Sequence, residues 1–349
     1  MNAKMSHIDV LNNKLTTSID DKMPIGLTSG KMGLCLYFNY LNRWLDMGKY
    51  DQVAEKLLDE VINDVSNTKD ITFENGLAGI AIAISHLIKK KFLAGEINEI
   101  LEEVDSCIFK KLAFLKQEEA KFSKSALLLL LYYLFIRYTE QTNYDEKYIF
   151  QELMICTIEI FQNNLSAIYF QEHFSFSAQN YQSPLFLAIF SKIYSLKIYN
   201  VRIDKIMKEI FKPILSTIPL LHANRLYLLW GLLCIRPYLP EYESEIVLSV
   251  QILIEKISIE HIMDVELKNQ DVYINNGLPL VYFLLFYIKE KFSEYKIDFH
   301  PLLFFEKIKN SEAWNSLLRN EYYLYKHRGL YDGFPGAYLT MLHIKKHFI

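Results

Sequence analysis

Glycine is concentrated in short, similar segments that recur about every fifty residues along the chain. The segments lie at residues 26–33, 73–79, 275–279 and 329–336, with a single match at Gly231. Only Gly48 and Gly95 lie outside them. A fixed period of this length indicates a repeat architecture. Glycine at recurring positions also indicates places where the backbone turns tightly or approaches another segment closely.

The sequence between the glycine segments predicts two kinds of helix. Residues 51–62 are amphipathic, with Val53, Leu57, Leu58 and Val61 on one stripe. The runs that follow the repeat positions are instead apolar on every side, which is typical of helices buried on every side. These runs are residues 80–84, 127–135, 185–190 and 280–287. Alternation of the two kinds predicts an all-α fold, an α/α toroid that is a double-layered barrel of about seven inner and seven outer helices.

Seven repeats cover the chain when the same spacing is carried through its middle. Their positions are Gly30, Gly76, Ser125, Asn180, Leu228, Gly277 and Gly333. No linker or change in composition interrupts them, so we predict a single domain over residues 1–349.

Composition excludes several classes of protein. The net charge of −3 gives no field for a polyanion, so we expect no nucleic-acid partner. The four cysteines have no spacing typical of a disulfide framework or a redox motif. The first residues lack the apolar run of a secretory signal, and residues 126–136 are too short to span a bilayer. We predict a cytoplasmic protein without a membrane span.

The glycine segments resemble those of the lanthionine synthetase C-like (LanC) family of peptide cyclases. The resemblance is strongest in the first, second and seventh repeats, and Pro184 supports it in the fourth. It implies an α/α toroid that holds zinc with two cysteines and a histidine. It also implies thioether formation, in which a cysteine thiol adds to a dehydrated serine or threonine. A metal serves this chemistry because it deprotonates the thiol that it binds.

The residues that carry this chemistry in the family are replaced here. The position of one zinc-binding cysteine holds Leu226, and the cysteine–histidine pair of the sixth repeat reads Asn275-Asn276. Gln179 stands where the family has a histidine that handles protons. Leucine cannot bind zinc, asparagine is a poor substitute for its usual ligands, and glutamine does not titrate near neutral pH. We therefore predict a degenerate member, a pseudoenzyme with no zinc or other cofactor.

Other residues offer little to rebuild the metal site. His222 and Cys234 are too far apart along one helix to share an ion. His343 and His347 have the i, i+4 spacing of a chelating pair, but no third ligand accompanies them and we expect an exposed face. The remaining histidines show no cluster in the sequence.

Polar and aromatic residues near the repeat positions are the candidates for contact with a peptide in the cavity. They are Glu74, Gln179, Asn180, Arg225, Tyr227, Asn275, Asn276, His327 and Asp332. An alternative role for Asn180 and Asn276 is to cap helices. Arg225 is suited to a peptide carboxylate or to a neighbouring acidic residue.

Three functions remain open. The first, which we favour, is a zinc-free protein of lanthipeptide-type biosynthesis that binds a precursor peptide or a modification enzyme such as a dehydratase. The second is an active enzyme with a site unlike the family's: a thioether-forming cyclase, or a toroidal glycosidase with Glu74 and Asp332 as its two carboxylates. The third is a scaffold without a small ligand.

Overall fold

The computed structural model describes residues 7–45, 48–114, 123–163, 165, 170–172, 174–268 and 272–348. Helices dominate these ranges, and no strand occurs within them. The all-α prediction is therefore confirmed. The chain forms two compact units. Unit 1 consists of Met1–Ile108, Asn269–Pro279 and His300–Ile349, and unit 2 consists of Phe109–Lys268 and Leu280–Phe299. The single domain remains a prediction.

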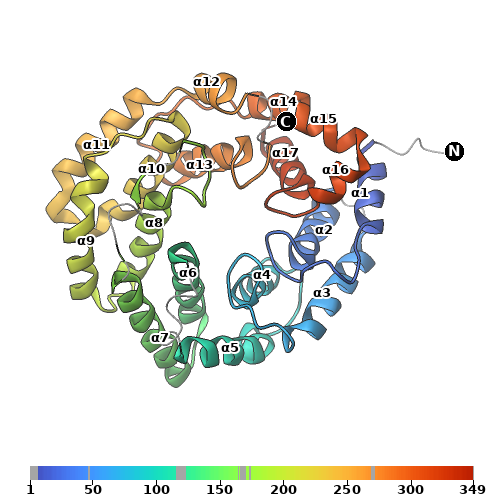
Figure 1. Ribbon diagram of the computed structural model, residues 1–349, viewed down its shortest axis with the longest axis horizontal. Helices are drawn as coiled ribbons and strands as arrows, with labels where there is room; N and C mark the ends of the chain where they lie inside the picture. Colours follow the sequence, from blue (N-terminus) through green and yellow to red (C-terminus); the bar gives the residue numbers. More distant parts are fainter. Residues whose placement is uncertain are drawn as a thin grey trace. The chain divides into compact units, whose positions relative to one another are not determined.

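Unit 1 joins the beginning of the chain to its end. Its helix α17 packs against α2, and α2 packs against α3 and α4 (Figure 1). The core where they meet is aromatic, because Phe334 stacks on Trp314 at a centroid distance of 5.4 Å and lies 6.2 Å from Tyr37. The helices are α1 (His7–Thr17), α2 (Lys31–Leu45), α3 (Asp51–Val65), α4 (Leu77–Lys89), α14 (Pro301–Asn310), α15 (Glu312–Arg319), α16 (Glu321–Lys326), α17 (Phe334–Phe348) and most of α5 (Ile97–Ala113).

Unit 2 centres on α8 and α10, which approach each other closely. A Cβ atom at Gly231 would lie 2.8 Å from Pro184 Cα, so the isolated glycine of the fifth repeat permits this contact. The helices are α6 (Lys124–Glu140), α7 (Tyr144–Asn163), α8 (Gln182–Ser195), α9 (Asn200–Leu215), α10 (His222–Ile235), η4 (Arg236–Tyr238), η5 (Pro240–Tyr242), α11 (Glu243–Lys256), α12 (Ile259–His261), the π-helical turn η6 (Ile262–Glu266) and most of α13 (Leu278–Lys291).

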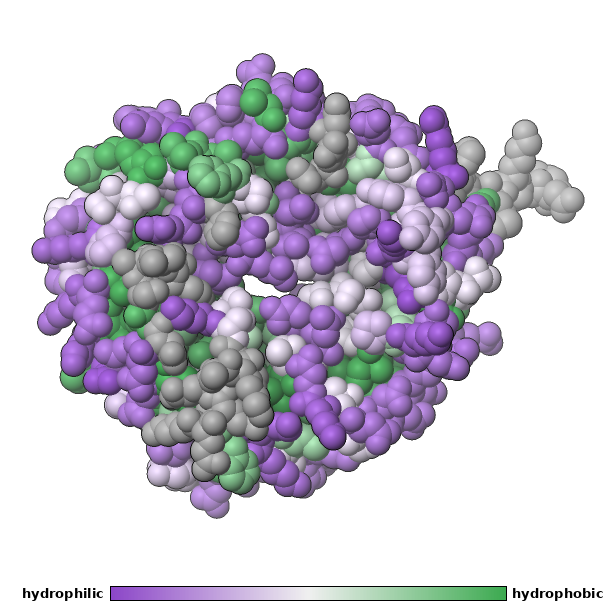
Figure 2. Space-filling model, in the orientation of Figure 1, coloured by the Kyte–Doolittle hydropathy of each residue, from purple (hydrophilic) through white to green (hydrophobic). Residues whose placement is uncertain are grey.

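Apolar side chains also reach the surface of unit 2. Figure 2 shows hydrophobic residues on the surface in the region of α11. Leu248 on α11 is 58% exposed, and Leu220, two residues before α10, is 72% exposed. No helix in the described part of the chain is both long and apolar enough to cross a membrane.

The predicted helices and the observed ones agree except in the fifth repeat. Long helices α2, α4, α6, α8, α13 and α17 begin within two residues of their repeat positions. On α3, Leu57 and Val61 are buried as predicted, whereas Val53 and Leu58 are half-buried. The fifth position, Leu228, lies inside α10 instead of before it. Leucine favours helix where glycine would interrupt it, so α10 begins six residues earlier, at His222.

The close approach at Gly26 leads to a stability prediction. A Cβ atom there would lie 2.3 Å from Asn75 Cα, which is backbone and cannot move aside. We expect Gly26→Ala to lower the free energy of unfolding by about 1–3 kcal/mol, as overpacking does, in urea denaturation. Thr72→Ala changes the equivalent position of the second repeat and should leave stability nearly unchanged. Equal effects of the two substitutions would contradict this explanation.

Candidate functional site

Backbone hydrogen bonds join four of the repeat loops in unit 1. The Thr28 amide donates to the Glu74 carbonyl (2.9 Å), the Tyr331 amide to the Thr28 carbonyl (2.9 Å), and the Asn275 amide to the Tyr331 carbonyl (3.2 Å). We call residues 26–30, 73–76, 274–277 and 329–333 the loop chain. The loop chain contains four predicted site residues (Glu74, Asn275, Asn276 and Asp332), and His327 precedes it. Loops far apart in sequence therefore gather five predicted residues in one unit.

A histidine packs between two tyrosines beside the loop chain. The rings of His327 and Tyr273 are stacked, with centroids 5.0 Å apart and planes 9° apart, and the Tyr323 ring centroid lies 4.4 Å from that of His327. The Tyr273 hydroxyl donates to the Tyr323 hydroxyl at 2.9 Å. His327 Nδ1 lies 3.1 Å from the Asp332 carbonyl oxygen. We call His327, Tyr273 and Tyr323 the His327 cluster.

The carboxyl groups of the loop chain hold their protons unusually tightly. Partial loss of water raises the pKa of Asp332, although a hydrogen bond from Asn275 and the nearby His327 oppose this. Burial raises the pKa of Glu74, and the Asp70 carboxylate raises it further. Burial raises the pKa of the Tyr331 hydroxyl, and the negative charges of Asp332 and Glu74 raise it further. The hydroxyl therefore stays protonated at neutral pH and can donate a hydrogen bond.

In unit 2, two glutamates hold the beginning of α10. Glu172 accepts hydrogen bonds from the amides of Leu220 (2.5 Å) and Leu221 (3.0 Å) and from the Asn224 side chain (2.8 Å). Glu266 accepts hydrogen bonds from the amides of His222 (2.6 Å) and Ala223 (2.9 Å). These bonds satisfy amide groups that a helix leaves without partners at its N-terminus. The sequence analysis missed both glutamates because each lies more than forty residues along the chain from the amides that it caps.

Two predicted contacts in unit 2 have structural roles. The Arg225 guanidinium donates to the carbonyls of Pro219, Leu220 and Lys256, at 2.7–3.0 Å, and no ion pair joins it to an acidic residue in the described part of the chain. Tyr227 is 3% exposed and stacks on Trp230 at 5.6 Å, which places it in the core.

The remaining predicted contacts in unit 2 lie before α8. Gln179 and Asn180 are exposed in the turn. The backbone amide of Gln179 donates to the Ser177 hydroxyl, and the backbone amide of Asn180 donates to the Ser177 carbonyl.

The residues that the sequence analysis placed at the family's zinc positions lie in different surroundings. Leu226 is fully buried among apolar side chains of α10, and Asn275 donates to the Asp332 carboxyl. The Asn276 Oδ1 atom is buried and accepts no hydrogen bond from any residue that the structure describes. Burial also raises the pKa of the Cys35 and Cys234 thiols to about 12, so neither is a ready nucleophile at neutral pH.

The other histidines considered as metal ligands lie in different surroundings. Burial, His347 and Lys346 lower the pKa of His343 to about 4, and His343 is half-buried beside Trp44 while His347 is exposed. His222 lies close to His261 and Glu266, a grouping that the sequence spacing did not reveal.

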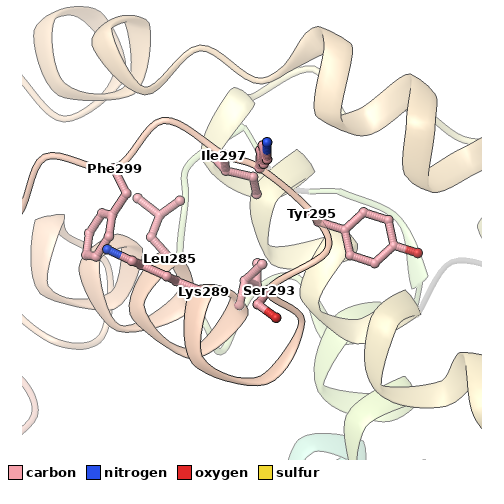
Figure 3. A pocket seen from close by; sticks show the side chains of 8 residues that line it. Leu285, Lys289, Ser293, Tyr295, Ile297 and Phe299 are labelled. Carbon is pink, nitrogen blue, oxygen red and sulfur yellow. The ribbon is translucent and has the colours of Figure 1, made fainter.

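A separate cavity of about 320 Å³ lies at the C-terminal end of α13 and in the loop that follows (Figure 3). It is lined by Leu285, Ile288, Lys289, Ser293, Tyr295, Lys296, Ile297 and Phe299. The Lys289 amine lies 5.7 Å from the Phe299 ring centroid. The cavity contains none of the predicted site residues.

Comparison with known proteins supports the resemblance drawn from the glycine segments. The model of the family described as "Lanthionine synthetase C-like protein" matches residues 21–173. The solved structure of "Nisin cyclase" matches with a TM-score of 0.53 and 14% identity, over 98% of this chain and 94% of that chain. That protein is an α/α toroid, so the predicted fold class is confirmed. No curated protein sequence matches the chain. The positions of Leu226, Asn275 and Asn276 lie outside the matched residues.

The raised pKa of Glu74 leads to a prediction about pH. Its carboxyl binds a proton more tightly in the folded chain than in the unfolded chain, so folding stability falls as pH rises from about 4.5 through the raised folded pKa. Glu74→Gln removes the titrating group. We expect this variant to gain stability relative to the parent as pH rises through the same interval, as measured by urea denaturation at several pH values. A stability difference that is constant with pH would contradict the assignment.

Proposed function

We propose that the chain, given its confirmed resemblance to lanthionine synthetase C-like proteins, acts in lanthipeptide-type peptide biosynthesis without the family's zinc. In this role it binds a precursor peptide, or a modification enzyme such as a dehydratase, in the cytoplasm. The match over residues 21–173 and the shared fold support the link to the family. The observation that carries the loss of zinc is Leu226, which is fully buried and has no atom that can bind a metal.

Side chains in each of the two units support the same proposal. Glu172 and Glu266 already bond to the backbone at the start of α10, and Leu226 lies one turn further along that helix. Asn275 uses its side chain to bond to Asp332, which lies in the same unit. Leu226 and Asn275 thus serve the protein's own structure, at positions that the resemblance assigns to zinc ligands.

The surface that we assign to the peptide is the loop chain together with the His327 cluster. Tyr323 and His327 are partly exposed, and aromatic rings of this kind bury large area at small entropic cost. Asn275 and the protonated Tyr331 hydroxyl add hydrogen-bonding groups that suit a peptide backbone.

A catalytic role for the carboxyl groups is the second candidate. Glu74 and Asp332 both have raised pKa values, and both influence the Tyr331 hydroxyl. A carboxylic acid that keeps its proton toward neutral pH is suited to general acid catalysis. If this candidate is right, Glu74→Gln abolishes turnover and leaves peptide binding intact.

Binding of the precursor peptide tests the proposal. The first probe is a synthetic peptide rich in Ser, Thr and Cys, labelled for fluorescence anisotropy, and the second probe is a purified lanthipeptide dehydratase. We expect Tyr323→Ala to weaken peptide binding about tenfold, equivalent to about 1.4 kcal/mol. Tyr322→Ala is the matched control, because Tyr322 is the adjacent residue, is 67% exposed and makes no contact with His327.

Two results would contradict the proposal. One is the absence of binding to both the peptide and the dehydratase. The other is a zinc ion that is lost when Asn275 and Asn276 are replaced by alanine, because that ion would occupy the positions that we propose to be inactive.

A further inference from the structure

Three potential metal ligands converge in unit 2, at the start of α10. One nitrogen from each of His222 and His261 and one oxygen from Glu266 all lie within 4.8 Å of one another. The two imidazole rings are 4.5 Å apart, and His261 Nε2 is 3.9 Å from Glu266 Oε1. The Glu266 side chain is 6% exposed and that of His261 is 43% exposed. The group is therefore anchored inside the protein and open to solvent on one side.

A local irregularity in the backbone creates this arrangement. His261 and Glu266 are five residues apart, and in an α-helix two such residues point about 140° away from each other. Here the chain forms a π-helical turn over Ile262–Glu266, closed by a hydrogen bond from the Leu267 amide to the Ile262 carbonyl (2.8 Å). A π turn has a five-residue spacing, so it brings Glu266 round to the side of His261. Turns of this type occur frequently at functional sites.

The protonation states and nearby charges suit a cation. His222 Nδ1 accepts a hydrogen bond from the Ser258 amide at 2.9 Å, so this ring is neutral, as metal binding requires. Each Glu266 oxygen accepts one amide hydrogen bond, so each keeps a lone pair for a metal. The α10 N-terminus and Arg225 repel a cation, and the charges of Glu172 and Glu266 offset this repulsion.

We propose that His222, His261 and Glu266 form a site for a divalent transition metal of the zinc class, distinct from the positions of Leu226, Asn275 and Asn276. Two imidazoles and one carboxylate suit Zn²⁺ or Co²⁺, and leave a fourth position for water or another ligand. The inference does not depend on the proposed function, because metal binding and peptide binding have separate readouts.

Metal binding changes one hydrogen bond. The Ser258 amide now donates to His222 Nδ1 at 2.9 Å, so the neutral ring carries its proton on Nε2. When the metal binds, the ring turns, gives up the Ser258 bond and holds its proton on Nδ1, which leaves the Nε2 lone pair for the metal. One hydrogen bond is lost and one metal–ligand bond is formed.

Titration of the metal-free full-length chain with Co²⁺ tests the site, because the visible spectrum of Co²⁺ reports its ligands. We expect one Co²⁺ per chain, displaced by one Zn²⁺. His261→Ala should weaken binding at least about tenfold, since loss of supporting groups alone costs 10–100-fold. His261 is the residue to replace because Glu266 also caps α10. Circular dichroism checks that the variant folds.

The control is His347→Ala, which alters the i, i+4 pair on α17 and should leave Co²⁺ affinity unchanged. Three results would overturn the inference: no Co²⁺ binding by the parent chain, unchanged affinity in His261→Ala, or loss of binding in His347→Ala. Loss of the metal on replacing Asn275 and Asn276 would contradict both this site and the proposed inactivity of the family positions.

Discussion

The close approach of backbone to backbone in the loop chain is the constraint on which unit 1 depends. A Cβ atom at Gly26 would lie 2.3 Å from Asn75 Cα, and one at Gly329 would lie 2.8 Å from Ser29 Cα. Only glycine leaves room for the amide of one loop to reach the carbonyl of the next. These hydrogen bonds hold the starts of α2, α4 and α17 in register, and the buried helices then pack behind them. The side chains of the candidate site are positioned by the same bonds.

Unit 2 holds its helices by different means. The fifth repeat has Leu228 at the position where other repeats have glycine. Carboxylates bond to the start of its helix, whereas backbone hydrogen bonds between loops hold the helix starts in unit 1. Glu172 and Glu266 satisfy the first amides of α10, and the one remaining glycine, Gly231, serves the contact between α10 and α8. Leu226, which we propose to occupy the position of a zinc ligand in the family, is an ordinary core residue of α10. Glu266 lies beside His222 and His261, with which we propose that it binds a metal.

The sequence predicts the parts of this structure that depend on local pattern. The glycine spacing marks the starts of α4 and α17 because the turn and the close approach both need glycine at fixed places. It fails at α10, where capping by distant glutamates leaves no periodic signal. The His327 cluster was found only in part, since stacking of Tyr273 on His327 depends on loops that meet in space. The pairing of His261 with Glu266 could not be predicted, because it requires a π turn that no spacing rule indicates.

Amide hydrogen exchange of Thr28, Tyr331 and Asn275 tests the central claim most directly. If their hydrogen bonds hold the loop chain together, these amides exchange only when unit 1 unfolds, and they are protected as strongly as the amides of α2. Exchange at the rate of an unstructured peptide, with α2 still protected, would contradict the account, because the helices would then be held in place without the bonds between their loops.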